Sequence, residues 1–457
     1  MFSSINDFKN VFFIGVAGSG MSAIAQYLQG WGKNVSGSDR YFTAGAYNET
    51  KEKLEAEGIR CFAQNGEGIT PETELIVVSA AIEDTVAEVQ KARAMNIPVL
   101  KRSELLSLIT QSRKTIAIGG TSGKSTASAM LFHILEQAGT DPGIISGAGL
   151  TELIQKGKIG NAKTGSGWLV IEADESDGSI VQYKPEIGVL LNIDKDHQEI
   201  DELISIFSIF KNNSKNFIVN RSNRFAAALS QNINNDFSGD ENIDAGFTGK
   251  NFMQDGFHIS FYIHDMLCKL PALGRHSMEN ALATSAAAKL SGIPVQQSVQ
   301  ALASYKGIYR RHQLVGRKHG VWLIDDYAHN PAKCAASIKA CQPVAEKLVA
   351  WFQPHGYGPT RFLRNDFVKE IADALRPQDE IWMSEIFYAG GTAVKDISAN
   401  NLINDLKQHG CNAYFTEQRN NFPSAVKNHL TENCVLLLMV ARDPGLEEFA
   451  KYVWEEI

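Results

Sequence analysis

Residues 120–126 read Gly-Thr-Ser-Gly-Lys-Ser-Thr, which places glycines, a lysine and hydroxyl groups at the spacing of a phosphate-binding turn. In such a turn the backbone N–H groups and the start of the next helix face the anion. Lys124 supplies a positive charge, and the Ser125 hydroxyl reaches Mg²⁺. The standard pattern begins with a glycine, and Ile118 stands at that position here. A helix start with an incidental glycine and lysine is the alternative interpretation, but the flanking elements favour a site for ATP and Mg²⁺.

Acidic side chains follow the next buried strand, which we expect at residues 168–171. Residues 172–177 read Glu-Ala-Asp-Glu-Ser-Asp, and four carboxylates so close together repel one another unless a cation or solvent relieves them. A solvated acidic loop is one interpretation. A metal site is favoured because ligands bind at the carboxyl ends of strands in α/β sheets. A strand over 187–193 also leads into polar residues, where His197 is either a second metal ligand or a surface histidine.

A second glycine-rich turn lies near the N-terminus. An apolar strand at 11–14 is followed by residues 15–20, Gly-Val-Ala-Gly-Ser-Gly, by a helix at 21–29 and by a strand that leads to Asp39. This order is typical of a nucleotide-binding βαβ unit. Its glycine spacing differs from that of the dinucleotide pattern, so a nucleotide-linked substrate is favoured over NAD. A nicotinamide oxidoreductase would also leave the other glycine turn and the acidic residues unexplained.

The elements that must position these residues alternate between strands and helices along the chain. Residues 115–118 form a buried strand, and apolar residues recur at helical spacing from 127 to 138. Further strands are expected at 75–79, 98–100, 321–324, 348–352, 381–386 and 434–440, and further helices at 277–290, 361–375, 397–408 and 446–457. Residues 221–270 are polar and irregular and predict little. The alternation predicts an α/β protein.

The composition excludes several classes of protein. The chain has 457 residues and a net charge of −7, which argues against a nucleic-acid binder. No apolar run approaches the length of a membrane span, and no basic segment precedes an apolar core at the N-terminus, so we expect neither membrane insertion nor secretion. The six cysteines are scattered without zinc-site spacing, which indicates reduced thiols in the cytoplasm.

Ten motifs, taken in order, resemble those of the Mur ligases, the ATP-dependent amino-acid ligases of peptidoglycan synthesis. They read GVAGSGMSAIA, VSGSD, KRSE, GTSGKST, EADESD, NIDKDH, GRHSMEN, YRRHQLVG, DDYAHNP and FQPH. The resemblance runs the length of the chain and is strongest to the branch of the family that adds L-alanine. It implies a UDP-binding Rossmann-like domain at residues 1–111, a central P-loop ATPase domain with a mainly parallel sheet at 112–312, and a C-terminal Rossmann-like domain at 313–457.

The resemblance also implies roles for particular residues. Those that would bind ATP are Gly120, Thr121, Gly123, Lys124, Ser125, Thr126, Asn280, Arg311, Asp326, His329 and Asn330. Those that would bind the substrates are Gly15, Gly18, Gly20, Met21, Ser22, Ser38, Asp39, Arg102 and His355. Mg²⁺ would be held by Ser125, Glu172 and His197, and catalysis would depend on Lys124, Glu172, His197 and Arg361.

The implied reaction is ATP-dependent formation of an amide bond between the carboxylate of UDP-N-acetylmuramate and the amino group of L-alanine. Because a carboxylate is a poor electrophile, its oxygen first attacks the γ-phosphate, which gives an acyl phosphate and ADP. The amine then attacks the acyl carbon, and phosphate leaves. The first step needs neutralised charge and atoms in line, which Lys124 and Mg²⁺ supply. No protein nucleophile is required, and the sequence contains no recognisable nucleophilic triad.

The chain departs from the family pattern on the side that would bind the acceptor. In the family, FQPH is usually followed by two arginines, and Gly356 and Pro359 stand at their positions, which leaves Arg361. The segment after His197 is short, as in the murein-peptide ligase, which joins a tripeptide to UDP-N-acetylmuramate. That activity, a Mur-type ligase with another acceptor, and a catalytically inactive nucleotide-binding regulator therefore remain alternatives.

Overall fold

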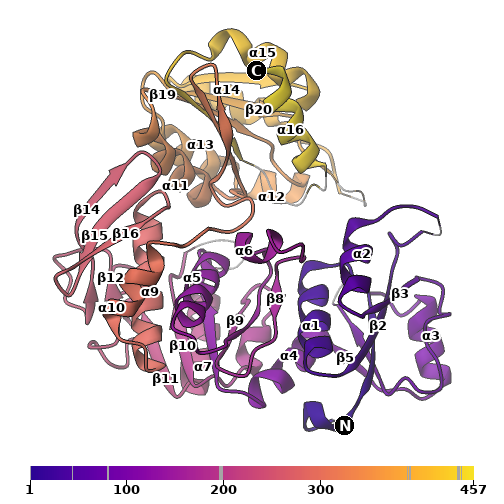
Figure 1. Ribbon diagram of the computed structural model, residues 1–457. Helices are drawn as coiled ribbons and strands as arrows, with labels where there is room; N and C mark the ends of the chain where they lie inside the picture. The colour runs from indigo at the N-terminus through magenta and orange to yellow at the C-terminus, as the bar shows by residue number, and fades with distance from the viewer. Residues whose placement is uncertain are drawn as a thin grey trace. The chain divides into compact units, whose positions relative to one another are not determined.

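The computed structural model describes residues 2–43, 45–79, 82–194, 199–388, 390, 393–439, 443 and 445–457. The chain divides into two compact units, which we describe separately. The first comprises Met1–Asn251, Phe261–Lys269 and Met278–Tyr309, and the second comprises Phe252–Ser260, Leu270–Ser277 and Arg310–Ile457. Figure 1 labels their elements. Within the described residues, no helix is both long enough and apolar enough to cross a membrane.

The first unit begins with a parallel sheet of order β3-β2-β1-β4-β5 (Figure 1). The central strands are rich in Val, Ile and Phe, which suits strands that helices cover on both faces. The strands are β1 (Asn10–Ile14), β2 (Asn34–Asp39), β3 (Arg60–Ala63), β4 (Leu75–Val78) and β5 (Val99–Lys101). The helices are η1 (Ile5–Asp7), α1 (Ser19–Gly30), α2 (Glu49–Ala56), α3 (Ala87–Ala94) and α4 (Arg102–Gln111).

A second sheet of the first unit has the order β11-β10-β6-β9-β7-β8, and its pairs are parallel except for β7 with β8. The strands are β6 (Thr115–Gly119), β7 (Gly143–Ile145), β8 (Ala162–Lys163), β9 (Leu169–Glu172), β10 (Ile187–Leu190) and β11 (Asn216–Val219). The helices are α5 (Lys124–Gln137), α6 (Thr151–Ile154), η2 (Ser179–Gln182), α7 (Ile200–Asn213) and α8 (Arg224–Ala227). The carboxyl ends of β6, β9 and β10 therefore meet at one edge, where the predicted site residues follow them.

Residues 221–270 contain more regular structure than the sequence predicted, and the helix predicted at 277–290 is present as α9. The small strands are β12 (Phe237–Ser238), β13 (Phe247–Thr248), β14 (Lys250–Asp255), β15 (His258–Ile263) and β16 (Met266–Leu270), and the helices that follow are α9 (Arg275–Leu290) and α10 (Val295–Leu302). In β15, Ile259, Phe261 and Ile263 are buried and alternate with more exposed residues. The period-two signal of a strand was therefore present in a stretch that we expected to be irregular.

The second unit contains a sheet of order β17-β18-β22-β19-β20-β21, in which only β17 pairs antiparallel among the described strands. Its strands are β17 (Gln313–Lys318), β18 (Val321–Asp326), β19 (Lys347–Phe352), β20 (Glu380–Ser384), β21 (Asn412–Thr416) and β22 (Cys434–Met439). Its helices are α11 (Pro331–Cys341), η3 (Gln342–Val344), α12 (Tyr357–Phe362), α13 (Arg364–Ala374), α14 (Ala399–Gln408), η4 (Arg419–Asn421), α15 (Phe422–Val426), η5 (Lys427–His429) and α16 (Leu446–Glu456). The helix predicted at 361–375 is two helices, because the backbone leaves the helical region at Leu363. The α/β class with mainly parallel sheets is confirmed.

A buried histidine, His133, links helices α5, α6 and α10 of the first unit. His133 Nδ1 lies 3.3 Å from Glu152 Oε2, and His133 Nε2 lies 2.9 Å from the carbonyl oxygen of Ala301. The His133 ring therefore connects the side chain of Glu152 to the backbone of Ala301. Burial alone would raise the pKa of Glu152, but its interactions with His133, together with the charges of Lys156 and Lys306, outweigh burial and lower that pKa below the ordinary 4.5.

We expect Glu152→Gln to lower the free energy of unfolding at pH 7 by about 1–3 kcal/mol, because the hydrogen bond between His133 and an ionised carboxylate is replaced by a weaker one to a neutral amide. A carboxyl group whose pKa is lowered by folding stabilises the fold at pH values above its unfolded-state pKa. This stabilisation is lost as the pH falls through its folded-state pKa. The difference in melting temperature between the variant and the wild type should therefore narrow below about pH 4.5. Glu49→Gln, which removes the exposed partner of Lys53, is the control and should change little at either pH. A difference in melting temperature between Glu152→Gln and the wild type that does not change with pH would contradict the stabilising role of the ionised Glu152 carboxylate.

Candidate active site

The turn between β6 and α5 adopts a backbone shape that requires glycine. Gly120 has φ of 135° and Gly123 has φ of 85°, both in the region that residues with a Cβ rarely adopt. A Cβ on Gly123 would also lie 2.8 Å from Oδ1 of Asn280, a buried residue of α9. The fold thus brings the predicted residue Asn280 against the turn. Thr126 follows in the first turn of α5.

Asn192 holds this turn in place, a role that the sequence did not reveal. Its Oδ1 accepts hydrogen bonds from the Thr121 hydroxyl at 2.9 Å and from the Ser122 N–H at 2.8 Å. Its Nδ2 donates to the carbonyl oxygen of Ser122 at 3.1 Å. Asn192 lies two residues beyond the end of β10 and is the first residue of the NIDKDH motif. Its proximity to the turn follows from the pairing of β10 with β6.

The side chain of Lys124 is nearly buried and lies among carboxylates. Its Nζ lies 2.7 Å from Glu175 Oε2, 3.8 Å from Asp174 Oδ1 and 2.8 Å from the carbonyl oxygen of Gly120. Burial disfavours the charged ammonium, but the two carboxylates outweigh burial and raise the pKa of Lys124. The lysine is therefore a fixed positive charge at the turn.

Ser125 and Glu172 are brought together as predicted. The Ser125 hydroxyl donates to Glu172 Oε2 at 2.9 Å, and the Gly147 N–H donates to Glu172 Oε1 at 2.8 Å. Ser146 also donates to this carboxylate. A hydroxyl and a carboxylate are the hard oxygen donors that Mg²⁺ prefers, and Mg²⁺ completes its shell with water and phosphate oxygens. Within the described residues, no set of three or more His, Cys, Asp or Glu side chains could hold a metal by itself. His197 lies outside the described residues.

The N-terminal glycine turn is held by the end of β2. The N–H of Gly15, which has φ of 80°, donates to the carbonyl oxygen of Ser38 at 2.7 Å. The carboxylate of Asp39 accepts hydrogen bonds from the N–H groups of Ala17 and Tyr41, each at 3.0 Å. Asp39 thus braces the turn that contains Gly18. The Ser38 side chain is fully buried.

The residues that open helix α1 contribute to packing as well as to the turn. Met21 and Ser22 are both buried, and the Ser22 hydroxyl donates to the carbonyl oxygen of Ser19 at 3.1 Å. Asn161 of the same unit donates to that hydroxyl at 2.9 Å. Gly20 lies against the Arg102 side chain, whose Cδ and Nη1 are each 3.2 Å from the position of a Cβ on Gly20. The glycine turn and Arg102, both of which the resemblance implied as substrate-binding, therefore lie next to each other.

In the second unit, three of the predicted residues gather around Tyr327. The guanidinium of Arg311 lies 4.8 Å from the centroid of the Tyr327 ring, and Nδ1 of His329 lies 3.0 Å from the carbonyl oxygen of Tyr327. Asp326, at the end of β18, accepts the N–H of His312 at 2.9 Å. Burial would raise the pKa of Asp326, but His312 and Arg311 outweigh it and lower that pKa. Asp326 is therefore an ionised carboxylate beside Arg311.

The other predicted residues of the second unit have local partners. Oδ1 of Asn330 accepts the N–H of Lys333 at 2.9 Å, so Asn330 caps helix α11. The ring of His355 lies 5.5 Å from that of Phe387. Nε of Arg361 donates to Asp396 at 2.9 Å, so this cation already has a carboxylate partner within the unit.

Comparisons with known proteins cover nearly the whole chain. Three family models match: the Mur ligase family catalytic domain at residues 10–114, the Mur ligase middle domain at 118–288, and the Mur ligase glutamate ligase domain at 310–442. The UDP-N-acetylmuramate–L-alanine ligase of Carboxydothermus hydrogenoformans is 32% identical over 453 residues, which cover 94% of this chain and 93% of that protein. The ligase of the same name from Synechococcus sp. (strain RCC307) is 32% identical over 463 residues, covering 95% of this chain and 93% of that protein.

Solved structures show the same architecture. The UDP-N-acetylmuramate–alanine ligase MurC of Thermotoga maritima matches with a TM-score of 0.79 at 24% identity over 98% of each chain. The murein peptide ligase of Psychrobacter arcticus matches with a TM-score of 0.67 at 19% identity, again over 98% of each chain. At these identities the structural likeness shows the fold.

Proposed function

The chain belongs to the Mur ligase family, and on that premise we propose that it is an ATP-dependent ligase that joins the carboxylate of UDP-N-acetylmuramate to the amino group of L-alanine. The observation that carries this proposal is the 32% identity to curated L-alanine ligases over 94% of the chain. The assembled turn supports it, because Lys124, Ser125 and Glu172 lie where phosphate transfer needs charge. The product would serve peptidoglycan synthesis, and the protein would work in the cytoplasm.

The reaction needs the γ-phosphate of ATP to be held in line with the sugar carboxylate. Lys124 is the cation of the turn, and phosphate oxygens replace Glu175 as its partner when ATP binds. One carboxylate oxygen attacks the γ-phosphorus, the bond to the β-phosphate oxygen breaks, and ADP leaves. The neutral amine then attacks the acyl carbon, and phosphate departs with the C–O electron pair. The protein contributes positioning and charge rather than a nucleophile.

The Ser125 hydroxyl and the Glu172 carboxylate would hold Mg²⁺ beside the phosphates. When bound, such an ion neutralises the charge that develops on the transferring phosphoryl group. A second metal at His197 is proposed from the family resemblance alone. On the same ground we assign the glycine turn at 15–20 and Arg102 to the UDP substrate, and Asn280 with Asp326 to the adenosine. We place the domain boundaries after residues 111 and 312, and the spans of the family models support this division.

The release of ADP tests the proposal. It should require ATP, UDP-N-acetylmuramate and L-alanine together, and the product should be the sugar nucleotide with one alanine added, as measured by mass spectrometry. The murein-peptide ligase activity is the second candidate, because Gly356 and Pro359 stand where the L-alanine branch carries arginines. Faster turnover with a tripeptide than with L-alanine would establish that alternative.

Arg361→Ala should raise the KM for the acceptor at least about fivefold and change the KM for ATP less than twofold, if Arg361 leaves Asp396 to hold the acceptor carboxylate. Initial rates at varied acceptor and at varied ATP measure both values. Arg364→Ala is the matched control, because Arg364 pairs with Asp405 at 2.7 Å in the same unit. Equal changes in the KM for the acceptor and the KM for ATP would indicate that Arg361 has only a structural role.

A further inference from the structure

The acidic loop, which we define as residues 173–178 after β9, reaches towards both phosphate-binding turns of the first unit. Glu175 contacts Lys124 of the ATP turn. Asp177, two residues further on, contacts a different cation: its Oδ2 accepts a hydrogen bond from Nη2 of Arg102 at 3.1 Å. The other oxygen of Asp177 accepts the N–H of Ser179 at 2.9 Å. The carboxylate is therefore fixed by its own backbone and in turn fixes the guanidinium.

Arg102 presents unused donors at the N-terminal glycine turn. Its Cδ and Nη1 lie 3.2 Å from the position of a Cβ on Gly20. Asp177 occupies Nη2, and within the described part of the chain no other acceptor bonds this guanidinium. Nε and Nη1 are thus left with hydrogen atoms to donate, beside a turn of the type that binds phosphate. The two groups point to different edges of the guanidinium plane, so each can donate to a separate phosphate oxygen.

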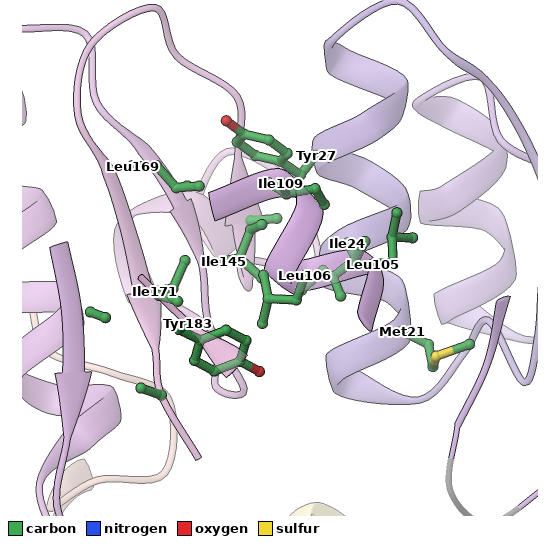
Figure 2. Packing of buried hydrophobic residues seen from close by; sticks show 14 of the residues in the cluster. Met21, Ile24, Tyr27, Leu105, Leu106, Ile109, Ile145, Leu169, Ile171 and Tyr183 are labelled. Carbon is green, nitrogen blue, oxygen red and sulfur yellow. The ribbon is translucent and has the colours of Figure 1, made fainter. Parts of the chain in front are cut away.

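The elements before and after the acidic loop, β9 and η2, belong to the region that packs against helices α1 and α4. Figure 2 shows apolar side chains of α1 and α4 packed against side chains from the second sheet and against Tyr183, which directly follows η2. Polar contacts add to this packing: Nε2 of Gln26 donates to Asn161 at 2.8 Å, and the Ser107 hydroxyl donates to the carbonyl oxygen of Gln182 at 3.0 Å. The buried residues labelled in the figure are Met21, Ile24, Tyr27, Leu105, Leu106, Ile109, Ile145, Leu169, Ile171 and Tyr183. The loop therefore leads into η2, which contacts α4, the helix that begins with Arg102.

We propose that Asp177 is a positioning residue for the diphosphate of the nucleotide substrate. It holds Arg102 beside the glycine turn, so that Nε and Nη1 can donate to phosphate oxygens at a lower cost in side-chain entropy on binding. This inference rests on the proposed function, which supplies a UDP-linked substrate. It assigns to the loop a role distinct from that of Glu172, the last residue of β9, on the metal.

The test is a set of binding measurements without turnover. Dissociation constants of UDP and ADP are measured by calorimetry, and that of uridine by NMR titration. Asp177→Asn should raise the Kd of UDP at least about fivefold, because the amide no longer holds the guanidinium as strongly. The Kd values of ADP and uridine should change less than twofold. Asp177→Glu should recover part of the loss, and Asp84→Asn, which removes the exposed partner of Arg93, should have no effect.

A double-mutant cycle separates positioning from a structural role. If Asp177 acts through Arg102, then adding Asp177→Asn to Arg102→Ala should leave the Kd of UDP unchanged from that of Arg102→Ala alone. Unchanged or tighter UDP binding in Asp177→Asn, or an equal loss for uridine, would overturn the inference while the proposed function stands. A wild-type protein that binds no UDP would overturn both.

Discussion

Lys124→Ala is expected to lower kcat at least about a hundredfold at saturating substrates. Lys124 is the cation that the turn at 120–126 directs at the transferring phosphoryl group, and removing one such stabilising group commonly costs several kcal/mol of transition-state energy. Release of ADP by the purified variant, with all three substrates present, measures the loss. Lys163→Ala is the control, because Lys163 pairs with Glu136 at 3.0 Å elsewhere in the first unit and should keep near wild-type turnover.

The same substitution leaves the buried carboxylate of Glu175 without its partner, so we expect the melting temperature to fall as well. The double variant Lys124→Ala with Glu175→Gln should recover the melting temperature but not the turnover. This outcome would separate the chemical role of the lysine from its role in the fold. Wild-type turnover in a folded Lys124→Ala protein would contradict the ATP-site assignment.

Glu172→Gln is expected to weaken the apparent affinity for Mg²⁺ at least about tenfold and to lower kcat. The substitution keeps the size of the side chain but replaces a hard anionic ligand by a neutral amide. It also places an NH₂ group near the donors Ser125 and Gly147, so hydrogen bonds that the carboxylate accepts are lost. The Mg²⁺ dependence of ADP release gives the apparent affinity. Mn²⁺ binding in the presence of ADP, followed by electron paramagnetic resonance, gives a value independent of turnover.

Glu136→Gln serves as the matched control for the metal site. Glu136 lies on α5, the helix that begins at the turn, and it pairs with Lys163 of β8. It should leave the Mg²⁺ dependence unchanged. An unchanged dependence in Glu172→Gln as well would make residues 172–177 a solvated acidic loop rather than a metal site.

The sequence predicted best those features that local patterns determine. The strand before Gly120 and the helix after Gly123 follow from an apolar run and a helical repeat, and the structure has both elements at those positions. Glycine marks the turn because its backbone requires positive φ. The contact between Ser125 and Glu172 could also be anticipated, since the carboxyl ends of neighbouring parallel strands share one edge of a sheet.

Contacts between side chains distant in sequence could not be read from the chain alone. Asn192 holds Ser122 across 70 residues, and Arg102 meets Asp177 across 75. Arg361 illustrates the same limit, because the family resemblance implied a catalytic role for it, whereas its pairing with Asp396 depends on the path of the chain 35 residues later. Such pairings depend on how the elements pack rather than on any local pattern.

The central claim is that the sugar carboxylate is activated by phosphoryl transfer from ATP. The most direct test uses UDP-N-acetylmuramate labelled with ¹⁸O in its carboxylate, together with ATP and L-alanine. If the acyl phosphate forms, the phosphate released in each turnover carries one ¹⁸O atom, and the amide product retains the other. Label that is found in AMP, or that is absent from phosphate while the product forms, would contradict the account.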